Sequence, residues 1–188
     1  MYKINQAVTS FVTYLAGSSF IYGFLFCMVE SFLPFLPLGL FIGLNIKAYG
    51  KVIGFLISFL GSLCGNIMSF LIFRKIAPFV YKHFPRLKEK AMKFKKVSFN
   101  RYTTFFSLPF APSFIFNILA GLSGLNFKNF IISRTISTLS IIIFWSFIGA
   151  SFIDALKNPI KLLYTTIIIV ICYILSKLVS KKLDVNIN

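Results

Sequence analysis

The chain alternates between long uncharged runs and short polar segments. Four runs contain no Asp, Glu, Lys or Arg: 7–29, 52–73, 102–127 and 135–153. A helix that crosses the roughly 30 Å hydrocarbon core of a bilayer needs about 20 apolar residues, and each run approaches or exceeds that length. The pattern predicts an all-α integral membrane protein that forms a single membrane domain over 1–188. The predicted full spans, about four in number, are 7–29, 52–73, 130–153 and 160–179.

Two further apolar segments are interrupted by prolines. Residues 33–46 are too short to span and contain the sequence PFLP, and residues 102–122 carry PFAP in their middle. Proline removes a backbone donor and clashes with the preceding turn, so each segment should break into two half-helices. Such a break at membrane depth is tolerated only where the backbone is buried in protein or lines a wet cavity. We therefore predict two re-entrant helical hairpins, whose prolines are Pro34, Pro37, Pro109 and Pro112.

The two halves of the chain also resemble each other weakly. LNIKAY (44–49) follows the first proline pair and LNFKNF (125–130) follows the second, with identical Leu, Asn and Lys. One full span separates the two hairpins, so they would enter from opposite faces and form an inverted repeat, as in many transporters. Chance similarity, and the general frequency of prolines in membrane helices, are the alternatives.

Positive charge is concentrated in one loop. Residues 74–101 hold ten Lys or Arg and one Glu, within a formal net charge of +16 for the chain. Lys and Arg collect in cytoplasmic loops, which predicts a cell-membrane protein with this loop and both termini in the cytoplasm. Nucleic acid is not an expected partner, because no nucleic-acid-reading motif accompanies the charge.

The basic loop contains a helical pattern of its own. Leu87, Ala91, Phe94 and Val97 recur at helical spacing, which predicts a basic amphipathic helix on the membrane surface. Pro78 and Pro85 are expected to break the chain before it. The basic residues of this region either bind lipid head groups or only anchor the orientation, and the candidates for head-group contact are Lys93, Lys95, Lys96 and Arg101.

Cysteine and histidine usage argues against metal, disulfide and catalytic chemistry. The three cysteines lie in different apolar segments, and the chain has one histidine and four acids. Neither zinc-ligand spacing nor a hydrolase or metalloprotease motif is present. The sequence predicts no cofactor, no metal and no enzyme. The N-terminal run continues past signal-peptide length without a cleavage site, so we expect it to be retained.

A few polar residues in apolar surroundings are candidates for a substrate or proton pathway. Glu30, the first acid in the chain, either exchanges protons or marks a helix end. Asn117 either caps a broken helix, which we favour, or contacts substrate, and Asn66 should form a helix–helix hydrogen bond. Arg134 either meets a phosphate or snorkels to the surface, and snorkelling is favoured. The candidates are Glu30, Pro34, Pro37, Asn45, Pro109, Pro112, Asn117 and Arg134.

The order and spacing of these residues resemble a known family. Glu30-x-x-x-Pro34-x-x-Pro37 in the first half, and Pro109-x-x-Pro112 followed by Asn117 and the AGL of 120–122, are similar to the VTT-domain superfamily. This superfamily is also called DedA-like or SNARE-associated Golgi proteins, and the small bacterial branch is the most similar. The resemblance covers residues 30–152.

The resemblance implies two facing re-entrant hairpins and lipid translocation. Eukaryotic members act as phospholipid scramblases, and several bacterial members recycle undecaprenyl phosphate. Many members carry an arginine just before the second proline pair, but this chain has FFSLPFAP there. Recognition of an anionic head group would then depend on Arg101 or Arg134.

Three functions follow as hypotheses. The first is a transporter or scramblase for a phospholipid or polyprenyl phosphate, with membrane lipids as its partners. The second is a proton-coupled carrier of a small ion or solute, with Glu30 as the coupling acid. The third is a scaffold for envelope proteins, in which substitution of Glu30 or Asn117 would leave function intact. The sequence does not give the oligomeric state.

Overall fold

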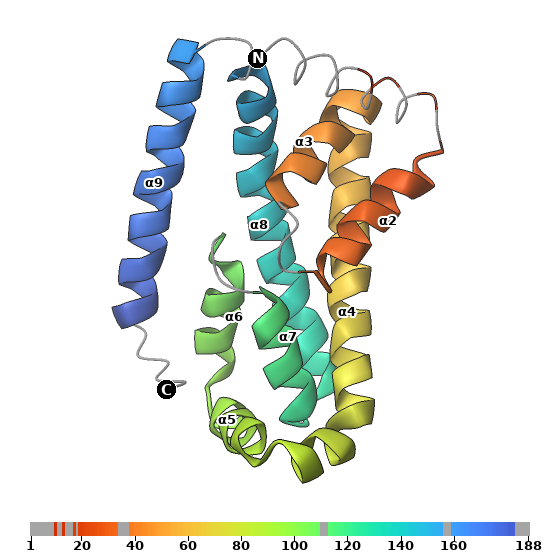
Figure 1. Ribbon diagram of the computed structural model, residues 1–188, viewed down its shortest axis with the longest axis vertical. Coiled ribbons are helices and arrows are strands. Elements are labelled where there is room, and N and C mark those ends of the chain that lie inside the picture. Colours follow the sequence, from red (N-terminus) through yellow and green to blue (C-terminus); the bar gives the residue numbers. More distant parts are fainter. Residues whose placement is uncertain are drawn as a thin grey trace.

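The computed structural model describes residues 10, 13, 17, 19–33, 38–109, 113–155 and 159–182. Every regular element in this part of the chain is an α-helix, as predicted. The helices (Figure 1) are α2 (Ile21–Glu30), α3 (Leu38–Tyr49), α4 (Lys51–His83), α5 (Pro85–Lys95), α6 (Phe99–Ser107), α7 (Ser113–Leu122), α8 (Phe127–Ala155) and α9 (Pro159–Lys182).

The long helix α4 packs against α2, α3, α5, α7 and α8, whereas α6 and α9 pack against α8. Its 33 residues correspond to about 50 Å, and it runs from one end of the molecule to the other (Figure 1). The predicted span 52–73 lies within it. The expected break at Pro78 was wrong, because Pro78 lies inside α4. Pro78 is exposed, as is Arg74, whose carbonyl loses its donor, so the missing bond falls on the surface side of the helix.

Two pairs of short helices approach the middle of the molecule from opposite ends: α2, α3 and α7 pack on α4, and α6 packs on α8. We call α2 and α3 the first helix pair, and α6 and α7 the second helix pair. The inner ends of both pairs lie about halfway along α4 (Figure 1). Aromatic contacts join the partners within each pair: the ring centroids of Phe26 and Phe41 are 5.5 Å apart, and those of Phe105 and Phe116 are 5.3 Å apart. The interrupted segment 102–122 is thus two helices, as its prolines predicted.

The first predicted span, 7–29, is not one continuous helix. Helix α2 begins only at Ile21, after a turn, and the backbone N–H of Ile21 donates to the Ser19 hydroxyl at 3.4 Å. A serine side chain near a helix start competes with continued helix by offering a local hydrogen bond to the backbone. Residues 21–29 of the predicted span therefore belong to α2, the first helix of the first helix pair. Most of residues 1–18 lie outside the described part of the chain.

The contact between α2 and α4 is unusually close. A Cβ atom added to Gly61 would lie 2.5 Å from the carbonyl oxygen of Phe24, and one added to Gly65 would lie 2.4 Å from that of Met28. Real Cβ atoms do not approach a carbonyl so closely, so only glycine allows the two backbones to meet here. Small residues at helix–helix contacts are typical of membrane proteins.

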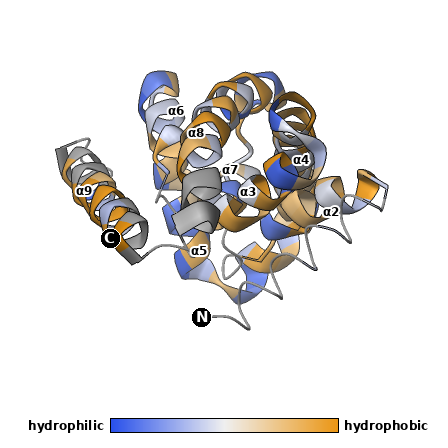
Figure 2. Cartoon of the chain, turned by 90° about the horizontal axis from the view of Figure 1, so that it is seen from above, coloured by the Kyte–Doolittle hydropathy of each residue, from blue (hydrophilic) through white to orange (hydrophobic). Residues whose placement is uncertain are grey.

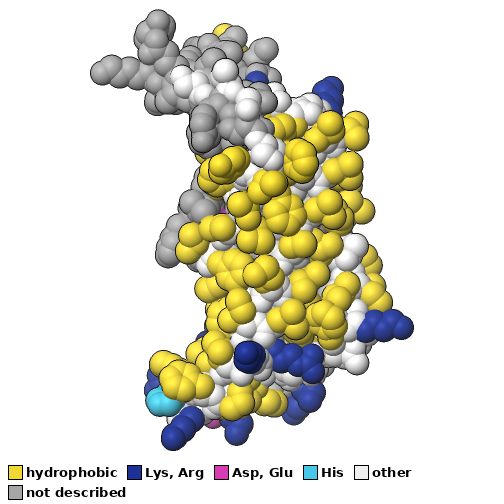
Figure 3. Space-filling model, turned by 90° about the vertical axis from the view of Figure 1, so that its right-hand side faces the viewer, with side chains coloured by type: hydrophobic (Ala, Val, Ile, Leu, Met, Phe, Trp, Pro, Cys, Tyr) yellow, Lys and Arg dark blue, Asp and Glu magenta, His cyan; other side chains and the backbone are white. Residues whose placement is uncertain are grey.

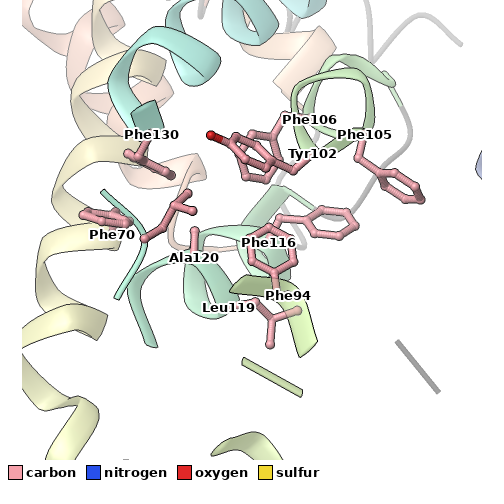
Figure 4. Close-up of a cluster of buried hydrophobic side chains, with 10 residues drawn as sticks. Phe70, Phe94, Tyr102, Phe105, Phe106, Phe116, Leu119, Ala120 and Phe130 are labelled. Atoms are coloured by element: carbon pink, nitrogen blue, oxygen red, sulfur yellow. The ribbon is translucent and has the colours of Figure 1, made fainter. Parts of the chain in front are cut away.

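An aromatic cluster fills the second helix pair and includes α5. Phe94 of α5 is 2% exposed, and its ring centroid lies 6.2 Å from that of Phe116 on α7. The amphipathic helix is therefore confirmed as a helix over Pro85–Lys95, with Val97 just after its end, and its buried Ala91 and Phe94 pack on protein. The buried members of the cluster (Figure 4) are Phe70, Phe94, Tyr102, Phe105, Phe106, Phe116, Leu119, Ala120, Leu125 and Phe130.

The outer surface is mostly hydrophobic between polar ends. Seen from above (Figure 2), α9 stands at the edge of the bundle, where it contacts α8. Figure 3 shows a broad hydrophobic face, with most of the visible Lys and Arg side chains at the end that carries α5. Within the described residues, two helical segments, 51–83 and 127–148, are long and apolar enough to cross a membrane. The predicted number of about four full spans is therefore not confirmed.

Candidate functional site

A buried arginine lies between α4, α8 and the second helix pair. Arg134 of α8 is 1% exposed, and its Nε and Nη2 donate to Oδ1 of Asn117 at 3.0 and 2.6 Å. Nη2 also donates to Oδ1 of Asn66 at 3.0 Å and to the carbonyl oxygen of Ser113 at 3.3 Å. The favoured expectation that Arg134 snorkels was wrong, because protein oxygens inside the bundle satisfy its guanidinium.

The two asparagines that hold Arg134 also bind each other. Nδ2 of Asn117 donates to Oδ1 of Asn66 at 2.7 Å, which links α7 to α4. The predicted helix–helix hydrogen bond of Asn66 is thereby confirmed. Asn117 does not cap a broken helix, because its side chain bonds to two other helices instead. We call Asn66, Asn117 and Arg134 the polar centre.

An aromatic ring closes one side of the polar centre. The guanidinium carbon of Arg134 lies 4.3 Å from the ring centroid of Phe106, which is fully buried in the aromatic cluster. A cation over the face of a desolvated ring is stabilised by about 2 kcal/mol. Phe106 therefore stabilises the guanidinium and excludes solvent from that side.

Glu30 connects the polar centre to the first helix pair. It is the last residue of α2 and is half-buried. Its charge interacts with that of Arg134, whereas the hydrogen bonds of the guanidinium go to amide and carbonyl oxygens. Glu30 thus lies at the inner end of the first helix pair, and Arg134 lies beside the inner end of the second. Among the described residues, no group of three His, Cys, Asp or Glu lies close enough to hold a metal ion.

Asn45 forms a separate polar contact within the first half. Its Nδ2 donates to the carbonyl oxygen of Gly23 at 3.2 Å and to the Ser58 hydroxyl at 2.9 Å, and it is 1% exposed. These bonds hold α3 against α2 and the start of α4. The position of Asn45 is thus that of a residue that fixes the first helix pair.

Replacing Asn45 with alanine is expected to lower the free energy of unfolding by about 1–3 kcal/mol, because buried partners lose their donor. Thermal or denaturant unfolding of the purified protein in detergent measures this loss. Asn129→Ala is the matched control, since Asn129 is exposed on α8. Equal stability of the Asn45 variant and the control would show that the Asn45 bonds contribute little.

The two similar stretches of sequence do not occupy equivalent positions. Residues 44–49 lie inside α3, whereas residues 125–130 cross from a turn into the start of α8. Asn45 is buried, but Asn126 is exposed, and its Oδ1 accepts the backbone N–H of Lys128 at 2.9 Å. Their similarity therefore reflects two different local roles and does not define the repeat.

The remaining predicted residues fall into two groups. Pro109 follows α6 and is half-buried, while Pro34, Pro37 and Pro112 lie outside the described residues. Arg101 is exposed on α6, so Arg134 is the arginine that lies beside Asn117. The basic residues expected to contact lipid head groups are all exposed: Lys93, Lys95, Lys96 and Arg101.

Ser58, Ser62, Thr138 and Phe106 were not among the predicted residues, although a pattern on α4 and α8 includes the first three. Ser58, Ser62 and Asn66 recur every four residues on α4, and Thr138 follows Arg134 by four on α8. Residues four apart share one helix face, so this spacing signals a polar stripe inside an apolar span. Phe106 gave no comparable signal, because the segment contains many phenylalanines.

Comparison with known proteins gives one family. The model of the VTT domain matches residues 8–151. The "Uncharacterized membrane protein YhjE" of Bacillus subtilis (strain 168) is 31% identical over 164 residues, which cover 85% of this chain and 79% of that protein. The "Uncharacterized protein YqeD" of the same organism is 26% identical over 168 residues, covering 86% and 81%. No solved structure matches the chain significantly.

Proposed function

Because the chain belongs to the VTT-domain family, we propose that it is a membrane lipid transporter that moves a phospholipid or a polyprenyl phosphate between leaflets. A membrane location is supported by the relative that is named a membrane protein and by the two long apolar helices. Neither the matching family nor the names of the relatives indicate a catalytic family.

The buried arginine carries this proposal. An ionisable residue inside a membrane protein is expensive to bury and usually marks a substrate or ion pathway. Nε and Nη2 of Arg134 now share one neutral amide oxygen, Oδ1 of Asn117, and the two oxygens of a phosphate could replace it by accepting one bond from each nitrogen. An anionic head group would also supply negative charge beside the guanidinium. The polar centre therefore favours a lipid that carries a phosphate.

The proposed path runs between two re-entrant hairpins, formed by the first and second helix pairs. Their helices have 9 to 12 residues, or about 14–18 Å each, which is roughly half the hydrocarbon thickness. Two half-depth pairs that meet near the middle shorten the distance over which a head group must cross. The acyl chains would remain in the surrounding lipid.

The basic end gives the proposed orientation. Exposed Lys93, Lys95, Lys96 and Arg101 lie on α5, the turn after it, and α6, where anionic lipid would meet them. We place this end and both chain termini in the cytoplasm, in the cell membrane, because positive charge is retained on that side.

Leaflet exchange in proteoliposomes tests the proposal. Labelled phospholipid and labelled polyprenyl phosphate are compared with wild-type protein, Glu30→Gln, and Glu89→Gln, an exposed acid on α5 that serves as control. We expect exchange by wild type and by the Glu89 variant, and about tenfold slower exchange by the Glu30 variant, which loses the charge that faces Arg134. Folded wild-type protein that moves neither lipid would contradict the proposal.

The second candidate is a proton-coupled carrier of a small ion or solute. Glu30 favours it, because a half-buried acid at the end of a short apolar helix can bind and release a proton during transport. Flux of a small ion driven by a proton gradient, without lipid exchange, would support this candidate over the first.

A further inference from the structure

The packing register of α4 and α8 identifies residues that face each other above the polar centre. Asn66 meets Arg134 through a hydrogen bond, and the ring of Phe70 stacks on that of Phe130 with centroids 4.1 Å apart. Phe70 follows Asn66 by four residues on α4, whereas Phe130 precedes Arg134 by four residues on α8. The two helices are therefore antiparallel. One turn in the other direction, the same register places Ser62 opposite Thr138.

Both of these residues carry a buried hydroxyl without an oxygen or nitrogen hydrogen-bond partner in the described part of the chain, as do Ser69 and Ser146 at other levels of the same two helices. Ser62 and Thr138 are each 2% exposed. Ser62 lies near the thiol of Cys27, which is only a weak partner. Buried polar groups in native proteins are almost always satisfied by protein or by ordered water. Two such hydroxyls on facing helices therefore point to water between them.

Other polar groups surround the same level of the bundle. The Ser31 hydroxyl, at the inner end of the first helix pair, donates to the carbonyl oxygen of Ser62 at 3.3 Å. Glu30 precedes Ser31 and interacts electrostatically with Arg134. A buried water needs two to four polar partners, and this region offers an acid, a base and several hydroxyls.

We propose that the inner ends of the two helix pairs enclose a hydrated polar chamber in which Ser62 and Thr138 bind water that connects Glu30 with Arg134. Glu30 and Ser31 bound it on the side of the first helix pair. The polar centre bounds it on the side of the second. The chamber goes beyond the proposed lipid transport, because it requires only water and is equally compatible with transport of a solute.

Substitution of Thr138 by valine tests the chamber, because valine keeps the shape of threonine and removes only its hydroxyl. If the hydroxyl binds water, the thermal unfolding midpoint of the purified protein falls by about 3 °C or more. Thr138→Ser retains a hydroxyl, so its unfolding midpoint should lie closer to that of wild type than to that of Thr138→Val. Thr104→Val is the matched control, since Thr104 is exposed and its hydroxyl bonds to its own helix at the Asn100 carbonyl.

A double-variant cycle with Ser62→Ala gives a second readout. If both hydroxyls bind the same water, the second substitution costs less than half of what it costs alone, because the water has already been lost. A Thr138→Val midpoint at or above wild type would overturn the proposal, since removal of a dry, unpaired hydroxyl is neutral or stabilising. Strictly additive shifts would also overturn it. Both measurements are independent of lipid exchange, so a failure of transport and a failure of the chamber are distinguishable.

Discussion

Replacing Arg134 with methionine is expected to reduce lipid exchange to the level of protein-free liposomes. Methionine fills much of the same volume but removes the positive charge and the N–H groups that donate to Asn66, Asn117 and the Ser113 carbonyl. Loss of a buried partner leaves polar groups unsatisfied at about 1–3 kcal/mol. Exchange in proteoliposomes and unfolding in detergent are measured on the same preparation, so loss of function is separated from loss of fold.

Two further variants make the result specific. Arg101→Met removes an arginine of the same type that is exposed on α6, and it should exchange lipid at the wild-type rate. Arg134→Lys keeps the charge but loses the planar fork of donors. We therefore expect its rate of lipid exchange to lie between the rates of wild type and the methionine variant. A folded methionine variant with wild-type exchange would rule out Arg134 as the head-group contact.

Replacing Gly65 with valine is expected to have the largest effect on stability. The new Cβ would lie 2.4 Å from the Met28 carbonyl oxygen and 2.8 Å from the Ser31 Cβ, so α2 must move away from α4. Overpacking of this kind costs about 1–3 kcal/mol, and more where backbone is the obstacle. The displacement also carries Glu30 away from Arg134, so lipid exchange should fall together with the unfolding midpoint.

A neighbouring position provides the control for that substitution. Cys64 precedes Gly65 on α4 but is exposed, so Cys64→Val also places valine there without meeting another helix. Its unfolding midpoint and exchange rate should remain near wild type. If Gly65→Val were as stable as Cys64→Val, the close approach of α2 and α4 would not be required for the fold.

Prolines and long uncharged runs made the helices of the second half predictable from sequence. Pro109 lies between α6 and α7, and the predicted span 130–153 falls inside α8, just as 52–73 falls inside α4. The first half was harder, because residues 7–29 read as one uninterrupted apolar run. The turn before Ile21 depends on Ser19 and on the packing of α2 against Gly61 and Gly65, and periodicity does not register such contacts.

The polar centre could be predicted only in part. Asn66 and Asn117 stood out as amides in apolar segments, and each forms a buried hydrogen bond. The burial of Arg134 could not be foreseen, because its partners lie 17 and 68 residues away in the chain. From sequence alone, a single arginine at the eighth position of an apolar helix is expected to snorkel to the surface. Only the tertiary structure shows that two amides lie beside it.

The position of Arg134 along the chain has a consequence for biosynthesis. The groups that contact or face its side chain in the described structure, from Glu30 and Asn66 to Phe106 and Asn117, all precede it in sequence. An arginine at the centre of a membrane helix costs about 2.5–3.5 kcal/mol when it enters lipid alone. Because α4 and the second helix pair leave the ribosome first, they are present to receive the guanidinium when α8 follows. A permuted gene that encoded α8 ahead of α4 would expose the arginine to lipid and should insert poorly.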